Sequence, residues 1–210
     1  MTHPTVQNSA QSPPPAISQR AFDVVAIAAS AGGIKAISTV LRGLPSDFPV
    51  AVVIVQHLAP QARSLLVDIL ARVTQLQVKQ AVTGDCLTAG WVYIAPPNYH
   101  LLVTADGTLA LTQSALVHFV RPSADLLFES VATSYGQRAI AVVLSGTGID
   151  GGLGVEAIKA KGGTVIAQNQ ASSAFFGMPH TAIETGQVDF VLPLNEIAPT
   201  LLSLVLKENH

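Results

Sequence analysis

The stretch VVAIAASAGGIKAI, residues 24–37, changes its hydrophobic pattern at a single serine. Residues 23–29 form a short apolar run that is rich in β-branched side chains, as in a strand covered on both faces. After Ser30, Ile34 and Ile37 begin a series of apolar residues spaced by three and four, as on one face of a helix. The stretch therefore predicts a strand, a tight turn that contains Ser30, and a helix.

This strand-and-helix unit recurs along the chain. Further short apolar runs lie at residues 50–55, 139–144 and 164–167, and a second amphipathic helix is predicted over residues 62–73. Buried strands that alternate with helices are typical of an α/β domain. We therefore expect a doubly wound, mostly parallel, Rossmann-like sheet.

The middle and the end of the chain add further elements. WVYIAPP (91–97) and HLLVTADGTLALTQ (100–113), with the turn signal Asp106–Gly107, predict an inserted antiparallel β-hairpin. A helix is expected over residues 123–136. Another helix is expected from about Pro179. A C-terminal helix that Asn195 could cap is expected after it.

Composition restricts the possible functions. The 210 residues, 49% of them hydrophobic, fit one domain at 21–207, preceded by a proline-containing arm or linker at 1–20 that we expect to be disordered. The net charge of −2 gives no basic field for nucleic acid. The apolar runs are shorter than the roughly 20 residues of a membrane-spanning helix. With Cys86 as the only cysteine, we expect a cytoplasmic protein without membrane insertion, disulfides or a cysteine-based zinc site.

Ser30 admits three interpretations. Serine is a preferred N-cap, so it could simply cap the following helix. The turn could also bind phosphate, although Gly32 and Gly33 match neither the dinucleotide-binding nor the P-loop spacing. The third interpretation is a nucleophile at a strand-to-helix turn, where the following backbone N–H stabilises an oxyanion.

A serine nucleophile needs a base and a group that orients the base. His57 follows the strand at 50–55, and Asp150 lies in a glycine-rich loop after the strand at 139–144. The carboxyl ends of parallel strands share one edge, so these residues can meet Ser30 there. Each also has a structural interpretation, His57 as a buried histidine and Asp150 as the cap of the helix that begins near Gly151.

The remaining histidines give weaker evidence of a functional role. His100 begins a strand, and structural and substrate-facing roles are equally open. His118 and His180 are expected on the surface or in loops, and the loop of His180 could face the same sheet edge.

Three stretches together carry a resemblance: AIAASAGGI (26–34), VIVQHL (53–58) and VVLSGTGIDGGLG (142–154). They resemble the catalytic domain of the chemotaxis protein-glutamate methylesterases, the CheB family, and the similarity extends over about residues 24–192. The resemblance implies Ser30 as nucleophile, His57 as base and Asp150 as its partner. It implies no metal or organic cofactor. The oxyanion would be held by the backbone of Ala31 and of Thr147 or a neighbouring glycine.

The resemblance also implies a substrate, namely glutamyl methyl esters on the cytoplasmic helices of chemoreceptors, often together with deamidation of particular glutamines. The family usually has threonine after the nucleophile and methionine within Gly-Met-Gly, whereas this chain has Ala31 and Thr147. The family also typically carries a receiver domain, which we do not find in this chain, so a separate receiver or signalling protein is an open partner.

Two other functions stay open at this point. One is a non-catalytic module that docks on a receptor or binds a phosphate or nucleotide at the turn of residues 31–33. The other is a general serine esterase for small esters.

Overall fold

A computed structural model describes residues 22–57 and 65–206 of the chain. The arm predicted at residues 1–20 lies outside the described residues, and so do residues 62–64 of the helix predicted over 62–73. In the described part, that helix, α2, spans Leu66–Ala71.

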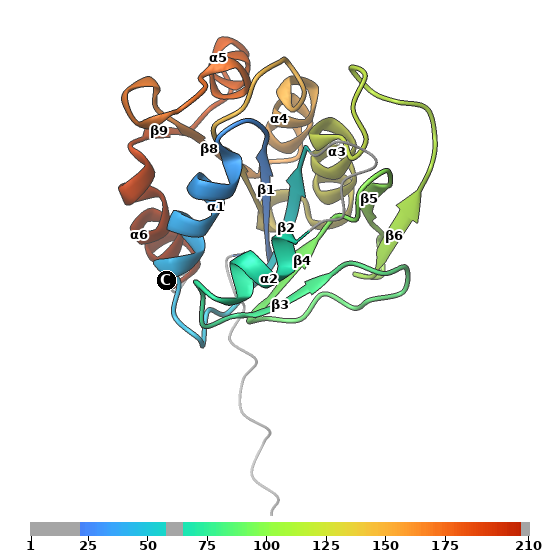
Figure 1. The fold of residues 1–210 in the computed structure, drawn as a ribbon. Helices are drawn as coiled ribbons and strands as arrows, with labels where there is room; N and C mark the ends of the chain where they lie inside the picture. Colours follow the sequence, from blue (N-terminus) through green and yellow to red (C-terminus); the bar gives the residue numbers. More distant parts are fainter. Residues whose placement is uncertain (1–21, 58–64, 207–210) are drawn as a thin grey trace, which may run out of the picture.

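Seven parallel strands form the central sheet, in the order β3-β4-β2-β1-β7-β8-β9 (Figure 1). This arrangement confirms the predicted mostly parallel α/β fold. The strands are β1 Val24–Ala29, β2 Ala51–Gln56, β3 Gln77–Gln80, β4 Trp91–Ile94, β7 Ala139–Val143, β8 Thr164–Gln168 and β9 Phe190–Leu192.

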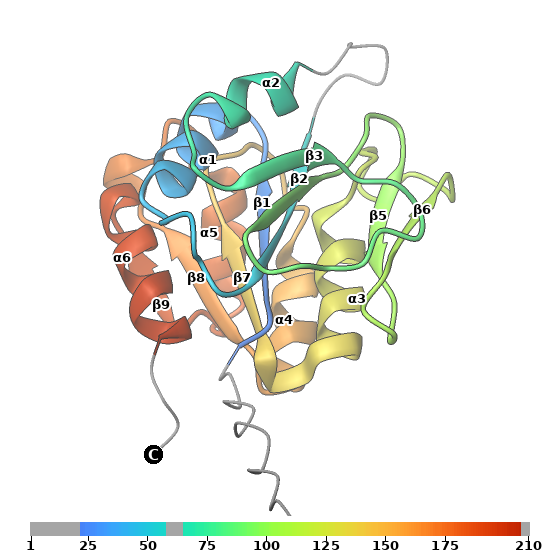
Figure 2. The same cartoon turned by 90° about the horizontal axis from the view of Figure 1, so that it is seen from below.

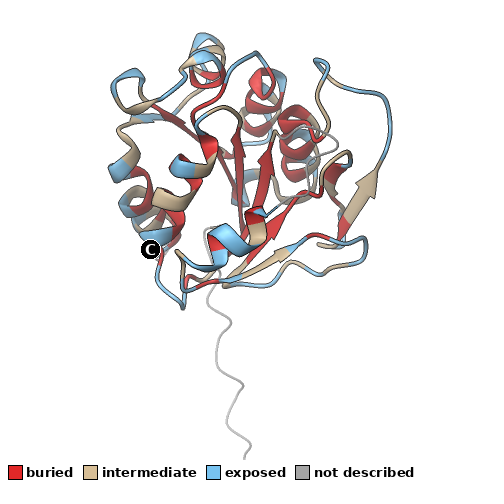
Figure 3. Cartoon of the chain, viewed as in Figure 1, coloured by how far each residue is buried: buried red, intermediate tan, exposed pale blue. Residues whose placement is uncertain are grey.

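Helices cover both faces of the sheet. Figure 2 shows α1 (Gly33–Arg42) and α6 (Leu194–Val205) on one side, and α3 (Ala124–Tyr135) and α4 (Gly152–Ala160) on the other. The strand side chains alternate between two apolar clusters, one under each helical layer. Burial follows this pattern in Figure 3, where the central strands are buried and the outer helix faces are exposed. Each helical layer therefore packs against its own apolar face of the sheet.

The predicted hairpin is smaller than expected. Among the strands of the described residues, only β5 (His100–Val103) and β6 (Leu109–Thr112) pair antiparallel, as a separate sheet packed against α3. The expectation that residues 91–97 belong to it is wrong, because β4 pairs with β2 and β3 in the main sheet. Val92, Tyr93 and Ile94 are all buried, which is the signature of an interior strand.

The helix predicted from about Pro179 is confirmed as α5, which spans Gly177–Glu184, but the predicted cap of the C-terminal helix needs correction. Asn195 does not cap the C-terminal helix, because the N-cap of α6 is Pro193 and no side chain caps it. Because α6 begins at Leu194, the asparagine lies inside the first turn. No helix in the described part of the chain is long and apolar enough to span a membrane.

The close contact between α3 and α4 depends on Gly154. A Cβ at this position would lie 2.6 Å from the Cβ of Phe128. We expect Gly154→Ala to lower the free energy of unfolding by about 1–3 kcal/mol, although alanine is the better helix former. Urea unfolding measures this, with Glu156→Ala on the same helix as the control. A Gly154→Ala protein as stable as wild type would contradict the packing described here.

Candidate active site

Three neighbouring strands bring the predicted site residues to one edge of the sheet. Ser30 follows β1 and His57 follows β2, while Asp150 lies in the loop between β7 and α4. The Ser30 N–H donates to the Ser145 carbonyl at 3.0 Å, and the His57 N–H donates to Ala29 at 3.0 Å. The backbone of the turn is thus fixed from both neighbouring strands.

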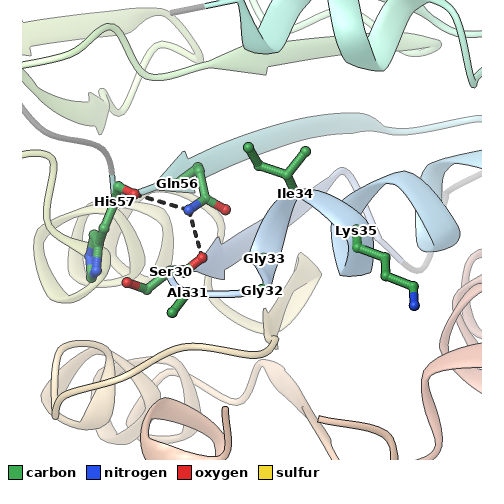
Figure 4. A pocket seen from close by; sticks show the side chains of 8 residues that line it. All are labelled: Ser30, Ala31, Gly32, Gly33, Ile34, Lys35, Gln56 and His57. Atoms are coloured by element: carbon green, nitrogen blue, oxygen red, sulfur yellow. Dashed lines mark hydrogen bonds between the residues drawn. The ribbon is translucent and has the colours of Figure 1, made fainter. Parts of the chain in front are cut away.

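The helix-cap interpretation of Ser30 is not what the structure shows. The N-cap of α1 is Gly32, and no side chain caps this helix. Among the described residues, the Ser30 hydroxyl has no hydrogen-bond partner. Ser30 and His57 line one cleft of about 450 Å³, and their side chains extend to the same side of it (Figure 4). The hydroxyl is therefore free to meet a ligand.

Gln56 joins the serine and the histidine, a role that the sequence did not suggest. Its Nε2 donates to the carbonyl oxygens of Ser30, at 2.8 Å, and of His57, at 3.0 Å (Figure 4). The side chain is only 4% exposed, and it leaves no space for a Cβ at Gly33, which would lie 2.3 Å from its Oε1. One buried amide thus fixes the distance between the two strand ends.

His57 and Asp150 are hydrogen-bonded to each other. His57 Nε2 lies 2.8 Å from Asp150 Oδ2, and the two side chains are only 10% and 3% exposed. An ionised carboxylate only accepts hydrogen bonds, so Nε2 carries the proton in this pair. The other ring nitrogen of neutral His57, Nδ1, is then left as a proton acceptor.

The carboxylate of Asp150 lies at the N-terminus of α3. It accepts hydrogen bonds from the Ser123 hydroxyl (2.8 Å), the Ala124 N–H (2.6 Å) and the Asp125 N–H (3.1 Å). Burial raises the pKa of Asp150, but the hydrogen bonds from His57, Ala124 and Asp125 outweigh burial, and the net pKa is lowered. Asp150 is therefore ionised at neutral pH.

The expectation that Asp150 caps its own helix is wrong. The start of α4 is satisfied instead by Asp125, whose Oδ1 accepts from the N–H groups of Gly151 (2.9 Å) and Gly154 (2.8 Å). Burial, and then the charge of Asp150, raise the pKa of Asp125 above its usual value, against the lowering effect of these N–H groups. The start of α3 thus binds a carboxylate from the loop before α4, and the start of α4 binds one from α3, over 25 to 29 residues of sequence.

The other histidines in the described part of the chain take no part in the hydrogen bond between His57 and Asp150. His100 is fully buried, with Nε2 3.0 Å from the Ala115 carbonyl oxygen. His118 pairs with Asp125 at 3.1 Å. His180 is exposed on α5 beside Glu184. Of the two roles left open for His100, the structure supports the structural one.

Comparison with known proteins decides the family. The family model for CheB methylesterase matches residues 25–201. The chain belongs to the CheB methylesterase family.

Individual relatives agree with this assignment. Protein-glutamate methylesterase/protein-glutamine glutaminase 2 of Anaeromyxobacter dehalogenans is 46% identical over 182 residues, which are 87% of this chain and 53% of that protein. A putative protein of the same name from Leptospira interrogans is 38% identical, over 87% of this chain and 95% of its own length. The chain thus spans about half the length of some curated relatives and nearly all of others.

A solved structure shows the same fold. The crystal structure of the Thermotoga maritima CheB methylesterase catalytic domain superposes with a TM-score of 0.84 at 37% identity, covering 88% of this chain and 99% of that one. The α/β sheet with its antiparallel insertion is therefore the fold of this family's catalytic domain.

Ala31 and Thr147, the two departures from the usual family pattern, each offer a free backbone donor. In the described part of the chain, the N–H groups of Ala31, Thr147 and Gly148 have no acceptor. The N–H of Gly146 donates to the Phe175 carbonyl at 3.0 Å and is not available. An oxyanion beside Ser30 therefore has Ala31 and either Thr147 or Gly148 as candidate donors, independent of the side chains.

One side-chain cluster has the composition of a metal site. His118, Asp125 and Asp150 offer ligand atoms that lie within 4.8 Å of one another. Each oxygen of Asp150, however, already accepts two hydrogen bonds from the protein. A carboxylate has about four lone-pair sites, so a cation would have to break the contacts that hold His57. The cluster fits a hydrogen-bond network better than a metal.

His100 makes stability depend on pH. Its Nδ1 accepts a hydrogen bond from the Ser123 N–H at 3.1 Å. A proton on Nδ1 would therefore face this N–H and break the hydrogen bond. Burial lowers the pKa of His100 below its ordinary value. Because the folded state favours the neutral ring, this stabilisation is present above the unfolded pKa of about 6.5 and is lost as the pH falls through the folded pKa.

We therefore expect wild type to lose more unfolding free energy between about pH 7.5 and pH 5.5 than His100→Gln loses. Urea unfolding at both pH values measures the difference. His180→Gln, at an exposed position, should keep the wild-type pH dependence. An equal slope for wild type and His100→Gln would show that the buried ring is not the group that titrates.

Proposed function

We propose that this protein hydrolyses glutamyl methyl esters on the cytoplasmic helices of chemoreceptors, as a serine hydrolase that acts in chemotaxis adaptation. The observation that carries the proposal is the hydrogen bond between Asp150 and His57, a residue that lines the same cleft as Ser30 with its free hydroxyl. Family membership supports the same chemistry. The protein that carries the ester is the partner, and the site would work in the cytoplasm, where such helices lie.

The reaction follows from the placement of the protons. The Ser30 Oγ attacks the ester carbonyl carbon while His57 Nδ1 takes its proton, and the oxyanion accepts hydrogen bonds from Ala31 and from Thr147 or Gly148. When the tetrahedral intermediate collapses, the proton passes from His57 to the leaving oxygen and methanol departs. Water, deprotonated by His57, then cleaves the acyl-enzyme and restores Ser30. Asp150 acts throughout by orienting the ring and stabilising its cation.

Glutamine deamidation is a second candidate activity. The same attack on a carboxamide releases ammonia instead of methanol, and several relatives carry both activities in their names. The cleft supplies a proton to either leaving group from the same nitrogen of His57.

The non-catalytic alternatives give a different result in one experiment. We expect Ser30→Ala to lower methanol release from a methylated receptor fragment by at least about 10⁴-fold, because no other hydroxyl side chain is among the described residues that line the cleft. Methanol is measured directly, and circular dichroism checks the fold. Ser38→Ala, on α1, is the matched control and should keep wild-type turnover. A fully active Ser30→Ala protein would contradict the proposal, because Ser30 would then not be the nucleophile.

A further inference from the structure

The peptide bond between Ser30 and Ala31 joins the candidate nucleophile to a candidate oxyanion donor. The Ser30 carbonyl and the Ala31 N–H belong to one planar unit, and this peptide bond is trans. In a trans peptide the C=O and the N–H point in opposite directions. The groups that hold the Ser30 carbonyl therefore also set the direction of the Ala31 N–H, which has no acceptor among the described residues.

Two donors hold the Ser30 carbonyl oxygen. The Gly33 N–H donates to it at 2.9 Å, which closes a turn with Ala31 and Gly32 at its centre. Gly32 has φ +74° and ψ −4°, as at the third residue of a type II turn. From β2, Gln56 Nε2 donates to the same oxygen at 2.8 Å (Figure 4). The carbonyl is thus held from the turn and from the neighbouring strand, and the Ala31 N–H is directed away from the Gln56 amide.

The serine turn depends on Gln56 more than the histidine does. Gln56 Nε2 also donates to the His57 carbonyl at 3.0 Å. His57 has two further supports, because its N–H donates to the Ala29 carbonyl at 3.0 Å and its Nε2 bonds Asp150 at 2.8 Å. Among the described residues, Gln56 is the only donor to the Ser30 carbonyl from outside the turn. Loss of the amide would therefore leave the ring held and the Ser30 carbonyl with one donor fewer.

Stability alone does not explain an amide at this position. The Gln56 side chain is only 4% exposed, and its Oε1 has no hydrogen-bond partner in the described part of the chain. A buried oxygen without a partner is unfavourable, and an apolar side chain of similar length, such as methionine, would avoid it. The two N–H groups of the amide, rather than its volume or its oxygen, are therefore the part of Gln56 that has a role.

We propose that Gln56 is a positioning residue for the reaction, which directs the Ala31 N–H towards the oxyanion that forms on the substrate at Ser30. This proposal rests on the proposed function, because the oxyanion is that of acyl transfer to the serine. All three residues line the same cleft. Gln56 acts through the peptide plane and does not itself contact the reacting atoms. A donor that is oriented before the oxyanion forms needs no reorganisation during the reaction.

Gln56→Met removes both donors and keeps the length of the side chain. We expect its kcat for a methylated receptor fragment to fall about 10- to 100-fold, because loss of a whole oxyanion donor costs about 10²–10³-fold. KM should stay within about twofold, since the oxyanion exists only after the substrate has bound. Gln56→Leu, a second neutral variant without donors, should show the same loss and keeps the test valid if the methionine protein does not fold.

Gln77→Met is the matched control, because Gln77 is exposed on the edge strand β3, and it should keep wild-type kinetics. Circular dichroism checks the fold of each variant. Wild-type kcat in Gln56→Met and Gln56→Leu would overturn the proposal. A loss through KM alone would also overturn it, since Gln56 would then affect substrate binding instead of the oxyanion.

A spectroscopic measurement tests the direction of the N–H itself. Diisopropyl fluorophosphate reacts with an activated serine: Oγ bonds to phosphorus, the P–F bond breaks, fluoride leaves, and the hydroxyl proton passes through His57 to solvent. The phosphoryl oxygen of the adduct then stands where the oxyanion would form. We expect the Ala31 amide proton to move downfield in the wild-type adduct, and by less than about half as much in the Gln56→Met adduct, because a misaligned hydrogen bond is weak. Equal shifts in both adducts, or no shift in wild type, would overturn the proposal.

The same reagent keeps this proposal and the proposed function separately testable, because it needs no receptor. Wild type that reacts at Ser30 but releases no methanol from the receptor fragment would refute the proposed function alone. Reaction of Gln56→Met that is at least about tenfold slower than wild type would still support the positioning role. Methanol release that requires Ser30 but is equal in wild type and Gln56→Met would refute the positioning role alone. Wild type that the reagent does not modify at Ser30 would overturn both.

Discussion

The carboxylate of Asp150 links the framework of the protein to its candidate chemistry. It accepts four hydrogen bonds, three from the start of α3 and one from His57. Oriented N–H groups at a helix start stabilise a negative charge without needing a buried cation. Because Asp125 makes the same kind of interaction with the start of α4, the two helices are joined at their N-termini, where the loop that contains Asp150 ends. The position of the histidine ring therefore depends on helix packing as much as on the sheet.

Much of the fold could be predicted from hydrophobic patterns. The interior strands β1, β2, β7 and β8 are continuous apolar runs, and such runs indicate strands buried on both faces. The pattern failed where burial is partial. β3, with the sequence QVKQ, is a polar edge strand without an apolar pattern, so the sequence does not show that β4 lies between two strands of the main sheet. Proximity along the chain therefore favours grouping residues 91–97 with the hairpin.

The site could be predicted in part, and the reason lies in topology. Residues that follow parallel strands reach one edge, which is enough to bring Ser30, His57 and Asp150 into one neighbourhood. The sequence could not reveal the role of Gln56, because it depends on which carbonyls its amide reaches in three dimensions. The exchange of caps through Asp125 was missed for the same reason. Capping rules apply to residues that are neighbours along the chain, whereas this exchange joins segments about 26 residues apart.

The central claim is that Asp150 holds His57 with its Nδ1 free to accept the proton of Ser30. The most direct measurement is the tautomer of His57 in a long-range ¹H–¹⁵N NMR spectrum at about pH 8.5, above the ordinary histidine pKa of about 6.5. His57→Gln assigns the signals. The account predicts a ring protonated at Nε2, with Nδ1 unprotonated. A ring protonated at Nδ1 would contradict it, because neither the bond to Asp150 nor the acceptor for Ser30 would then be in place.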